Sequence, residues 1–281
     1  SIPQALDAIY DHGHGTVIDN NVFNPETHKS TVTDEAVTLV SDHVMLQNSL
    51  VSNVVLKSGD GASTYQTPAD FTVDAEKGVL KLVSGGGIQA GTTNFKVSYD
   101  YADASKVTPA EIIGAVNAAG NRTGIKALQD TYNLYGFFAK ILIAPIYCTQ
   151  TSDSTELIAM ADKLDAIAYI DAPIGTTFAQ ALAGRGPSGT INFNTSSDRV
   201  RLCYPHVKVY DPVTNKERLE PLSQRLAGLR AKTDYEKGYW SSLSNQELSG
   251  VIGVERQLSA MIDESQSEVY LLKEVGITTV C

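Results

Sequence analysis

Apolar positions recur with two different periods along the chain, and the change between them divides it into parts. In residues 1–13 the apolar positions Ile2, Leu6 and Ile9 lie three or four apart, with Pro3 in the first turn. This spacing predicts a short helix that ends at Gly13 or Gly15. Residues 16–23, TVIDNNVF, predict a strand before an Asn-Pro turn.

Residues 28–103 are rich in short apolar runs with period-two alternation, separated by Gly and Asp turns. These runs are Val37–Val40, Val51–Leu56, Phe71–Val73, Val79–Val83 and Phe95–Tyr101. Short strands at close spacing, with no helix between them, predict a small antiparallel β sandwich or barrel. We therefore expect residues 28–104 to form an inserted β domain, and residues 1–27 and 105–281 to form one discontinuous α/β domain around it.

Helix and strand patterns alternate after residue 107. Helices are predicted at 108–120 (Thr108 as N-cap, Pro109 at the first position, Glu111 closing a capping box), 124–132, 152–164, 176–184, from Pro221 onward and at 267–275. Strands are predicted at 137–146 (buried on both faces), 166–170, 190–193, 200–204, 206–210 (as part of a hairpin) and 277–280. The fold class expected is α/β, with a mainly parallel or mixed sheet, helices and the inserted β domain.

Charge and composition exclude several partners. The net charge is −10, whereas nucleic acids and anionic membranes require a basic surface. No apolar run reaches the roughly 18–20 residues of a membrane span. The cysteines Cys148, Cys203 and Cys281 form no CxxC pair, which favours buried or free thiols over a metal cluster. We expect neither nucleic acid nor membrane as a partner.

The motifs that could carry chemistry are incomplete. Gly184–Gly189 matches G-x-G-x-x-G, but a helix precedes it, a strand follows it and Pro187 lacks a backbone N–H, so we interpret it as a structural loop. His12 and His14 lack a third ligand, which favours an exposed turn. Asp7 and Asp11 lie on one helix face and are interpreted as solvated.

Two further clusters have structural interpretations. The acidic group around Asp263, Glu264 and Glu268 lacks the spacing of an EF-hand loop. Ser241, Ser242 and Ser244 fit no nucleophile elbow and are suited to turns and helix caps. We therefore expect no catalytic residue, no cofactor site and no metal site.

Residues 226–252 contain the single Trp of the chain. Tyr239 and Trp240 follow Gly238, and such a pair most often packs in a core or an interface. We expect Trp240 to be mostly buried, and the Ser/Asn-rich turn after it to orient the following apolar run toward the core.

Several segments resemble a known family in sequence, order and spacing. They are AYIDAP (168–173), RGPSG (185–189), SDRVRLCYPHVKVYDP (197–212), AGLRAKTDYEKGYWSSLSNQELSGVIG (227–253) and LLKEVGITTV (271–280), together with the start (1–25), FTVDAEKGVLKL (71–82) and KVSYDYAD (96–103). The family is that of the tail sheath proteins of contractile-tailed bacteriophages and R-type bacteriocins. The resemblance covers nearly the whole chain, and the 227–253 block is its most specific part.

The resemblance implies a structural protein of a virion or prophage tail, assembled in the bacterial host cytoplasm. Sheath subunits of this family form hexameric rings stacked around a tail tube protein, between a baseplate and a tail terminator. Their contraction drives the tube through the bacterial envelope for host genome ejection. The resemblance implies that the chain lacks the N-terminal portion and the C-terminal domain of the family, so we expect it to be a monomer by itself.

The resemblance also directs attention to interface residues. The candidates are Trp240, Tyr239, Arg230, Lys232, Asp234, Asn245 and Arg185. Two basic groups, Lys208 with Lys216 and Arg218, or Arg225 with Arg230 and Lys232, are expected to meet acidic patches on neighbouring subunits.

Two other classes of function stay open from the sequence. One is a nucleotide- or sugar-binding α/β enzyme with its ligand at the carboxyl edge of the sheet. The other is a carbohydrate-binding adhesion module formed by the inserted domain, which is expected to be surface-exposed because it interrupts another domain.

Overall fold

The computed structural model describes the chain except residues 1, 14, 90, 213–214 and 281. The chain divides into two compact units. One consists of Ser1–Asn21 with Pro109–Cys281, and the other of Val22–Thr108.

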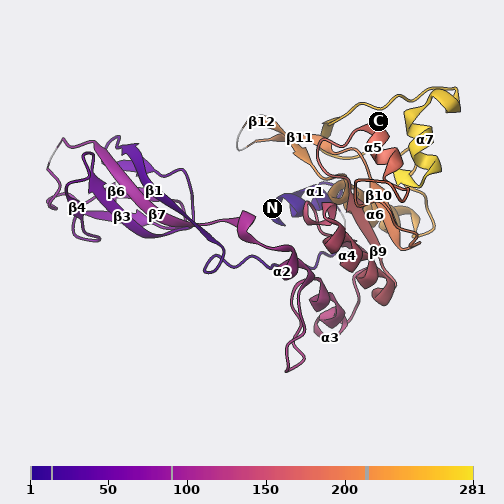
Figure 1. Ribbon diagram of the computed structural model, residues 1–281, viewed down its shortest axis with the longest axis horizontal. Helices are drawn as coiled ribbons and strands as arrows, with labels where there is room; N and C mark the ends of the chain where they lie inside the picture. Colours follow the sequence, from indigo (N-terminus) through magenta and orange to yellow (C-terminus); the bar gives the residue numbers. More distant parts are fainter. Residues whose placement is uncertain (1, 14, 90, 213–214, 281) are drawn as a thin grey trace. The chain divides into compact units, whose positions relative to one another are not determined.

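The Val22–Thr108 unit contains two antiparallel sheets (Figure 1). The first has the order β1-β7-β3-β4, formed by Lys29–Thr38, Asn94–Ala102, Val51–Ser58 and Thr64–Tyr65. The second has the order β2-β6-β5, formed by His43–Met45, Val79–Leu82 and Phe71–Asp74. A short 3-10 helix, η1 (Ala104–Lys106), follows β7, and Asp103 caps it by accepting a hydrogen bond from the Ser105 backbone N–H.

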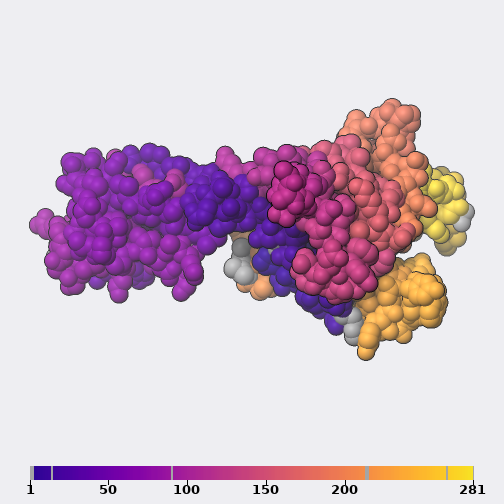
Figure 2. All heavy atoms as spheres, turned by 90° about the horizontal axis from the view of Figure 1, so that it is seen from below, coloured from indigo at the N-terminus to yellow at the C-terminus, as the bar shows by residue number. Residues whose placement is uncertain are grey.

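Alternating apolar positions from both sheets form the core of this unit. Leu56, Phe95 and Val97 of the first sheet are buried together with Phe71 and Leu80 of the second. The side chains point inward at every second position because successive residues of a strand face opposite sides. Figure 2 shows the outer surface of this unit in indigo and purple. Its core cluster shares no residue with the described cluster around Leu222 and Leu226 of the other unit.

The other unit is built on a parallel sheet of order β14-β10-β9-β8. Its strands are Ile277–Thr278, Val200–Cys203, Ile167–Asp171 and Ile141–Ile143, and each adjacent pair is parallel. The helices α4 (Thr151–Leu164) and α6 (Leu222–Lys237) both pack on β9 (Figure 1). The central strand β9 is buried from Ala168 to Asp171, as expected of a strand covered by helices.

A second, antiparallel sheet completes this unit. Its order is β12-β11-β13, formed by Lys216–Glu220, Val207–Asp211 and Val251–Val254. The remaining elements are α1 (Ile2–Tyr10), α2 (Pro109–Ile113), η2 (Gly124–Asp130), α3 (Thr131–Tyr135), η3 (Tyr147–Thr149), α5 (Phe178–Ala183), η4 (Glu264–Gln266) and α7 (Glu268–Glu274). None of the described helices is long and apolar enough to cross a membrane.

Two predicted strands are wrong. Apolar and polar residues alternate in 16–23 and 190–193, but neither segment forms a strand. A segment with β propensity forms a strand only where it can hydrogen-bond to a neighbouring strand. The backbone of the first segment is extended, and the Asn20 side chain donates to the Gly124 carbonyl at 2.6 Å.

Two other predicted elements are much shorter than expected. The strand predicted at 137–146 is only β8, at the edge of its sheet, and Phe137 and Phe138 are exposed rather than buried. The helix predicted at 108–120 ends at Ile113, because Gly114 adopts φ +78°.

Candidate functional site: an aromatic pair at the end of α6

The helix α6 changes character along its length. Its first eight residues, Leu222–Leu229, are all buried, which is typical of a helix enclosed by its own domain. From Asp234 onward the helix is exposed, and it ends at Gly238 with φ +91°. The C-terminal end of α6 is therefore exposed to solvent, whereas its N-terminal half is buried in the core.

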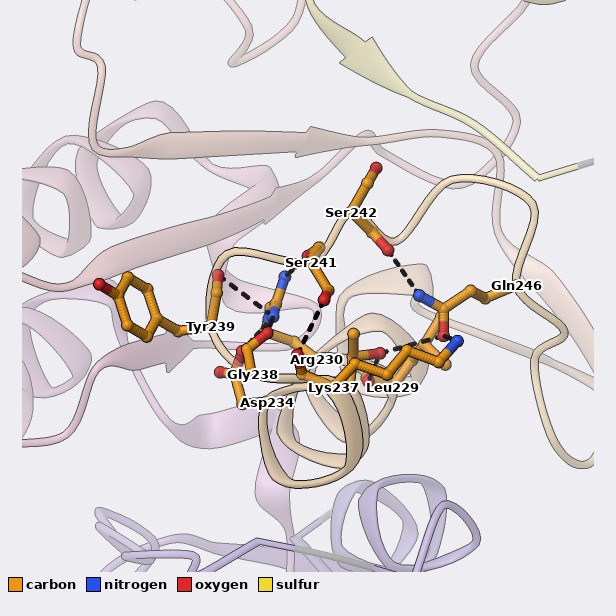
Figure 3. A network of polar contacts seen from close by, with 10 residues as sticks. Leu229, Arg230, Asp234, Lys237, Gly238, Tyr239, Ser241, Ser242 and Gln246 are labelled. Carbon is orange, nitrogen blue, oxygen red and sulfur yellow. Dashed lines mark hydrogen bonds and ion pairs between the residues drawn. The ribbon is translucent and has the colours of Figure 1, made fainter.

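Arg230 closes this exposed end (Figure 3). Its guanidinium donates to the Ser241 carbonyl at 2.7 Å and lies within 3.4 Å of the Gly238 carbonyl, and it also pairs with Asp234. The last carbonyls of a helix have no partner within the helix, and an Arg side chain can satisfy them. Arg230 thereby holds the 238–241 turn against the helix.

Tyr239 and Trp240 project from this turn into solvent, with 81% and 76% of their surface exposed. Their rings meet edge to face, with centroids 5.2 Å apart. The prediction that Trp240 is mostly buried is therefore wrong. Its ring lies over Gly238, where an added Cβ would come within 2.5 Å of it, so the ring covers backbone rather than entering the core. Figure 3 shows Tyr239 pointing away from the Arg230 network.

The turn after Trp240 is tied to the other side of α6. Gln246 accepts hydrogen bonds from Thr233 at 3.1 Å and Lys237 at 3.5 Å, and donates to the Ser242 carbonyl at 2.5 Å (Figure 3). Asn245 is exposed in the left-handed conformation, φ +57°, which Asn tolerates better than most residues.

The apolar run after this turn is divided between core and solvent. Val251 packs on a buried cluster, whereas Ile252 is 56% exposed. The expectation that the run turns toward the core is thus met at Val251 and not at Ile252. Lys232, on α6, is half-buried.

Arg185 has a structural position in the Gly184–Gly189 loop. Its guanidinium donates to the carbonyls of Val275 at 2.9 Å, Phe193 at 3.0 Å and Thr195 at 2.5 Å. An added Cβ on Gly189 would meet the Gly184 Cα at 2.6 Å, so the glycines allow a close backbone approach. The loop follows α5 and leads to no strand, as a structural loop would.

Arg225 is not available as a surface cation. Its side chain is 4% exposed and pairs with Asp11, in the turn after α1, and, at 3.1 Å, with the buried Glu220. The prediction that Arg225 meets an acidic neighbour is wrong, because the acidic partners come from the same chain. Asp11, interpreted as solvated, is one of them. In the hairpin, Lys208 pairs with Glu217 at 3.6 Å.

A buried polar cluster at the carboxyl end of β9 escaped the sequence analysis. The Asp171 carboxylate accepts hydrogen bonds from the Ser223 backbone N–H at 2.9 Å and from the Ser223 hydroxyl at 2.6 Å. The Cys148 thiol lies 3.6 Å from the same carboxylate, and Asn192 donates to the carbonyls of Cys148 and Asp171. Burial raises the pKa of Asp171, while the Ser223 hydrogen bonds oppose the rise. The one signal in the sequence is an acidic residue at the end of a strand predicted to be buried.

This cluster has a structural rather than a catalytic geometry. Asp171 caps the first turn of α6, where a carboxylate satisfies free N–H groups. Burial raises the pKa of the Cys148 thiol well above its ordinary value, which keeps it protonated and poorly nucleophilic. Within the described residues, no group of three or more His, Cys, Asp or Glu side chains could hold a metal ion.

His12 is buried, whereas the sequence predicted an exposed turn. Only 3% of its surface is exposed, and both ring nitrogens have partners, at the Ala8 carbonyl and the Ser249 backbone N–H. His14, its predicted companion, lies outside the described residues, as does Cys281.

Comparison with known proteins identifies the family. The model described as phage tail sheath protein central domain matches residues 120–281, and a second one, for a protein of unknown function, matches residues 24–111. The tail sheath protein of Burkholderia phage BcepMu is 64% identical over the whole chain, which covers 59% of that relative. The tail sheath protein of Escherichia phage P2 is 31% identical over 61% of the chain and 41% of the relative.

Two solved structures match part of this chain. A chain of the anti-feeding prophage baseplate shares 23% identity over 59% of this chain and 39% of its own length, with a TM-score of 0.35. A chain of the helical sheath of the same particle, in the contracted state, gives a TM-score of 0.34, with 23% identity over 52% of this chain and 36% of its own length.

The described residues form an α/β unit in which aromatic side chains are displayed on a turn at a helix end. The chain belongs to the phage tail sheath family, since the central-domain model matches more than half of it. Its relatives are structural proteins and not enzymes. The chain spans 59% or less of the length of the two curated relatives described here.

Proposed function

We propose that this chain is the central part of a contractile sheath subunit. Copies assemble into hexameric rings that stack around a tail tube protein, between a baseplate and a tail terminator. The assembled sheath contracts and drives the tube through the bacterial envelope. The match of residues 120–281 to the sheath central domain is the observation that carries this proposal.

The helix end displays the residue types that dominate protein interfaces. Trp, Tyr and Arg are enriched among the residues that contribute most to binding. Tyr239 and Trp240 are exposed on a turn whose backbone carbonyls are held by Arg230, so less backbone entropy is lost when a partner covers them. We assign this turn, with Lys232, Asp234 and Asn245, to a contact between neighbouring sheath subunits, and Arg230 to holding the turn in place. Arg185 is not included, because its guanidinium is engaged by carbonyls of its own domain.

The Val22–Thr108 unit takes the outer surface of the sheath in this proposal. A domain inserted between two segments of another is tolerated best where it does not interrupt packing. In this proposal, assembly takes place in the bacterial host cytoplasm.

Electron microscopy of the intact sheath protein, expressed without other tail components, tests the proposal. We expect hollow tubular polymers of uniform diameter, because a heterologous contact between subunits propagates until a ring or helix forms. The proposal would be contradicted by monodisperse particles of subunit size at high protein concentration that persist after purified tube protein is added.

A further inference from the structure

The helix α1 is held on α6 by an unusually close contact around His12. Ile9 of α1 is buried in one cluster with Leu222 and Leu226 of α6. At Gly228 an added Cβ would come within 2.6 Å of the Ile9 carbonyl and 2.8 Å of His12 Nδ1. No side chain larger than hydrogen fits there, so the imidazole has no room to move toward α6.

The hydrogen bonds of His12 define its protonation state. The Ser249 backbone N–H donates to Nε2 at 3.2 Å, so Nε2 acts as an acceptor and carries no proton. Nδ1 then carries the proton and donates to the Ala8 carbonyl at 3.2 Å. The neutral ring therefore links α1 to the segment before β13.

The charged groups around His12 come from each element packed against it. Asp11 precedes it in the turn after α1, and Arg225 and Lys232 lie on α6. Glu220 of β12 faces Arg225 from the other side at 3.1 Å. Glu247 is exposed, two residues before Ser249. Asp11 and Glu220 are both engaged by Arg225, which leaves the imidazole close to a buried guanidinium.

We propose that His12, just after α1, is an acid-sensitive latch: the neutral imidazole links α1 to the Ser249 backbone, and protonation at Nε2 breaks this link. A proton on Nε2 removes the acceptor used by the Ser249 N–H. The two N–H donors, at Nε2 and at the Ser249 backbone, then face each other. It also adds a positive charge next to Arg225.

The direction of the pH effect follows from burial. Burial lowers the pKa of His12 below its ordinary value of 6.5, and Arg225 adds to the effect. A lowered pKa in the folded state means that the unfolded state binds the proton more readily. The stability that the latch contributes is thus complete above about pH 6.5 and is lost as the pH falls through the lower folded-state pKa.

Amide hydrogen exchange of the chain at pH 7.5 and pH 5.0 tests the latch. After correction for the intrinsic pH dependence of exchange, we expect the protection of residues 5–12 to fall about tenfold or more at the lower pH. The protection of β9 and α4 should remain unchanged. In a His12→Gln variant the protection of α1 should no longer depend on pH, whereas His43→Gln, at an exposed histidine of the other unit, should behave like the parent chain.

Equal protection of α1 at both pH values in the parent chain would overturn the proposal, as would an unaltered pH dependence in His12→Gln. Should that variant not fold, NMR titration of the parent chain decides instead. The imidazole resonances of His12 and the amide resonances of α1 should then titrate together below pH 6.5. Titration of His12 without any change in the α1 amides would contradict the latch.

Discussion

Single residues of this chain often have a role that depends on their depth in the fold. Arg225 and Arg230 lie five positions apart on α6, yet the first is enclosed by Asp11 and Glu220 and the second closes a solvent-exposed turn. Trp240, the single Trp of the sequence, is exposed. Its ring was expected to fill a core but instead covers Gly238. Its exposure is what makes it a candidate for contact with another subunit.

Substitution of Trp240 separates an interface role from a folding role. Trp240→Ala should change the free energy of unfolding by less than about 0.5 kcal/mol, because the ring is 76% exposed and makes no core contact. In the intact sheath protein the same change should strongly reduce the yield of tubular polymer, measured by sedimentation. Ile262→Ala, at another fully exposed apolar residue, provides the control and should leave the yield unaltered. A normal yield for Trp240→Ala would remove this turn from the proposed subunit contact.

At the scale of elements, α6 connects the buried and the exposed parts of its unit. Its first turn is capped by Asp171 from the end of β9, its middle packs against α1, and its last turn carries the Arg230 network. The Asp171 carboxylate and the aromatic pair therefore lie at opposite ends of the same helix.

Substitution of Asp171 tests how much this cap contributes to the stability of the fold. Asp171→Ala removes the acceptor of two Ser223 donors and should destabilise the fold by about 1–3 kcal/mol in urea unfolding. Asp171→Asn keeps one acceptor oxygen and should cost less.

The pH dependence of the same position has a defined sign. Burial raises the pKa of Asp171 above its ordinary 3.8, so the folded state holds the proton more tightly than the unfolded state. The stability of the parent chain relative to Asp171→Asn should therefore be greatest below about pH 3.8 and decrease as the pH rises through the folded-state pKa. If the stability of the parent chain relative to Asp171→Asn instead increased with pH, the Ser223 hydrogen bonds would affect the pKa of Asp171 more than burial does.

At the scale of the whole molecule, one unit is inserted into the chain of the other. The inserted unit begins and ends on paired strands, since Lys29 lies opposite Ala102 and Asp103 N–H donates to the His28 carbonyl at 2.8 Å. The chain thus enters and leaves the inserted unit at neighbouring positions, and its core is made of its own residues.

Excision of the inserted unit should therefore be tolerated. Residues 22–108 expressed alone should unfold in a single cooperative transition, as small domains with one core do. Replacement of the same residues by a short Gly/Ser linker should leave the amide protection of β9 and α6 in the remaining chain unchanged. Loss of protection in β9 after excision would show that the two units depend on each other for folding.

The sequence by itself determined the elements with strong local signals. The 3.6-residue period of α4, the helix start at Pro221 and the period-two strands of residues 51–101 all lie near their predicted positions. A parallel sheet followed from alternating strands and helices, and the family followed from the segments at 168–173, 185–189 and 227–253. These features depend on neighbours in the sequence, which a linear pattern contains.

Which residues are buried and which are exposed depended on contacts made in the folded chain. The TVIDNNVF segment lacks a partner strand, His12 is enclosed because Gly228 lets α1 approach α6, and Trp240 is exposed because Arg230 fixes the turn that carries it. Burial and pairing are set by residues more than 200 positions away in the case of His12 and Ser249. A side chain of one type is stable in a core or on a surface depending on such distant neighbours, so the sequence determined the elements and the fold determined their exposed and buried faces.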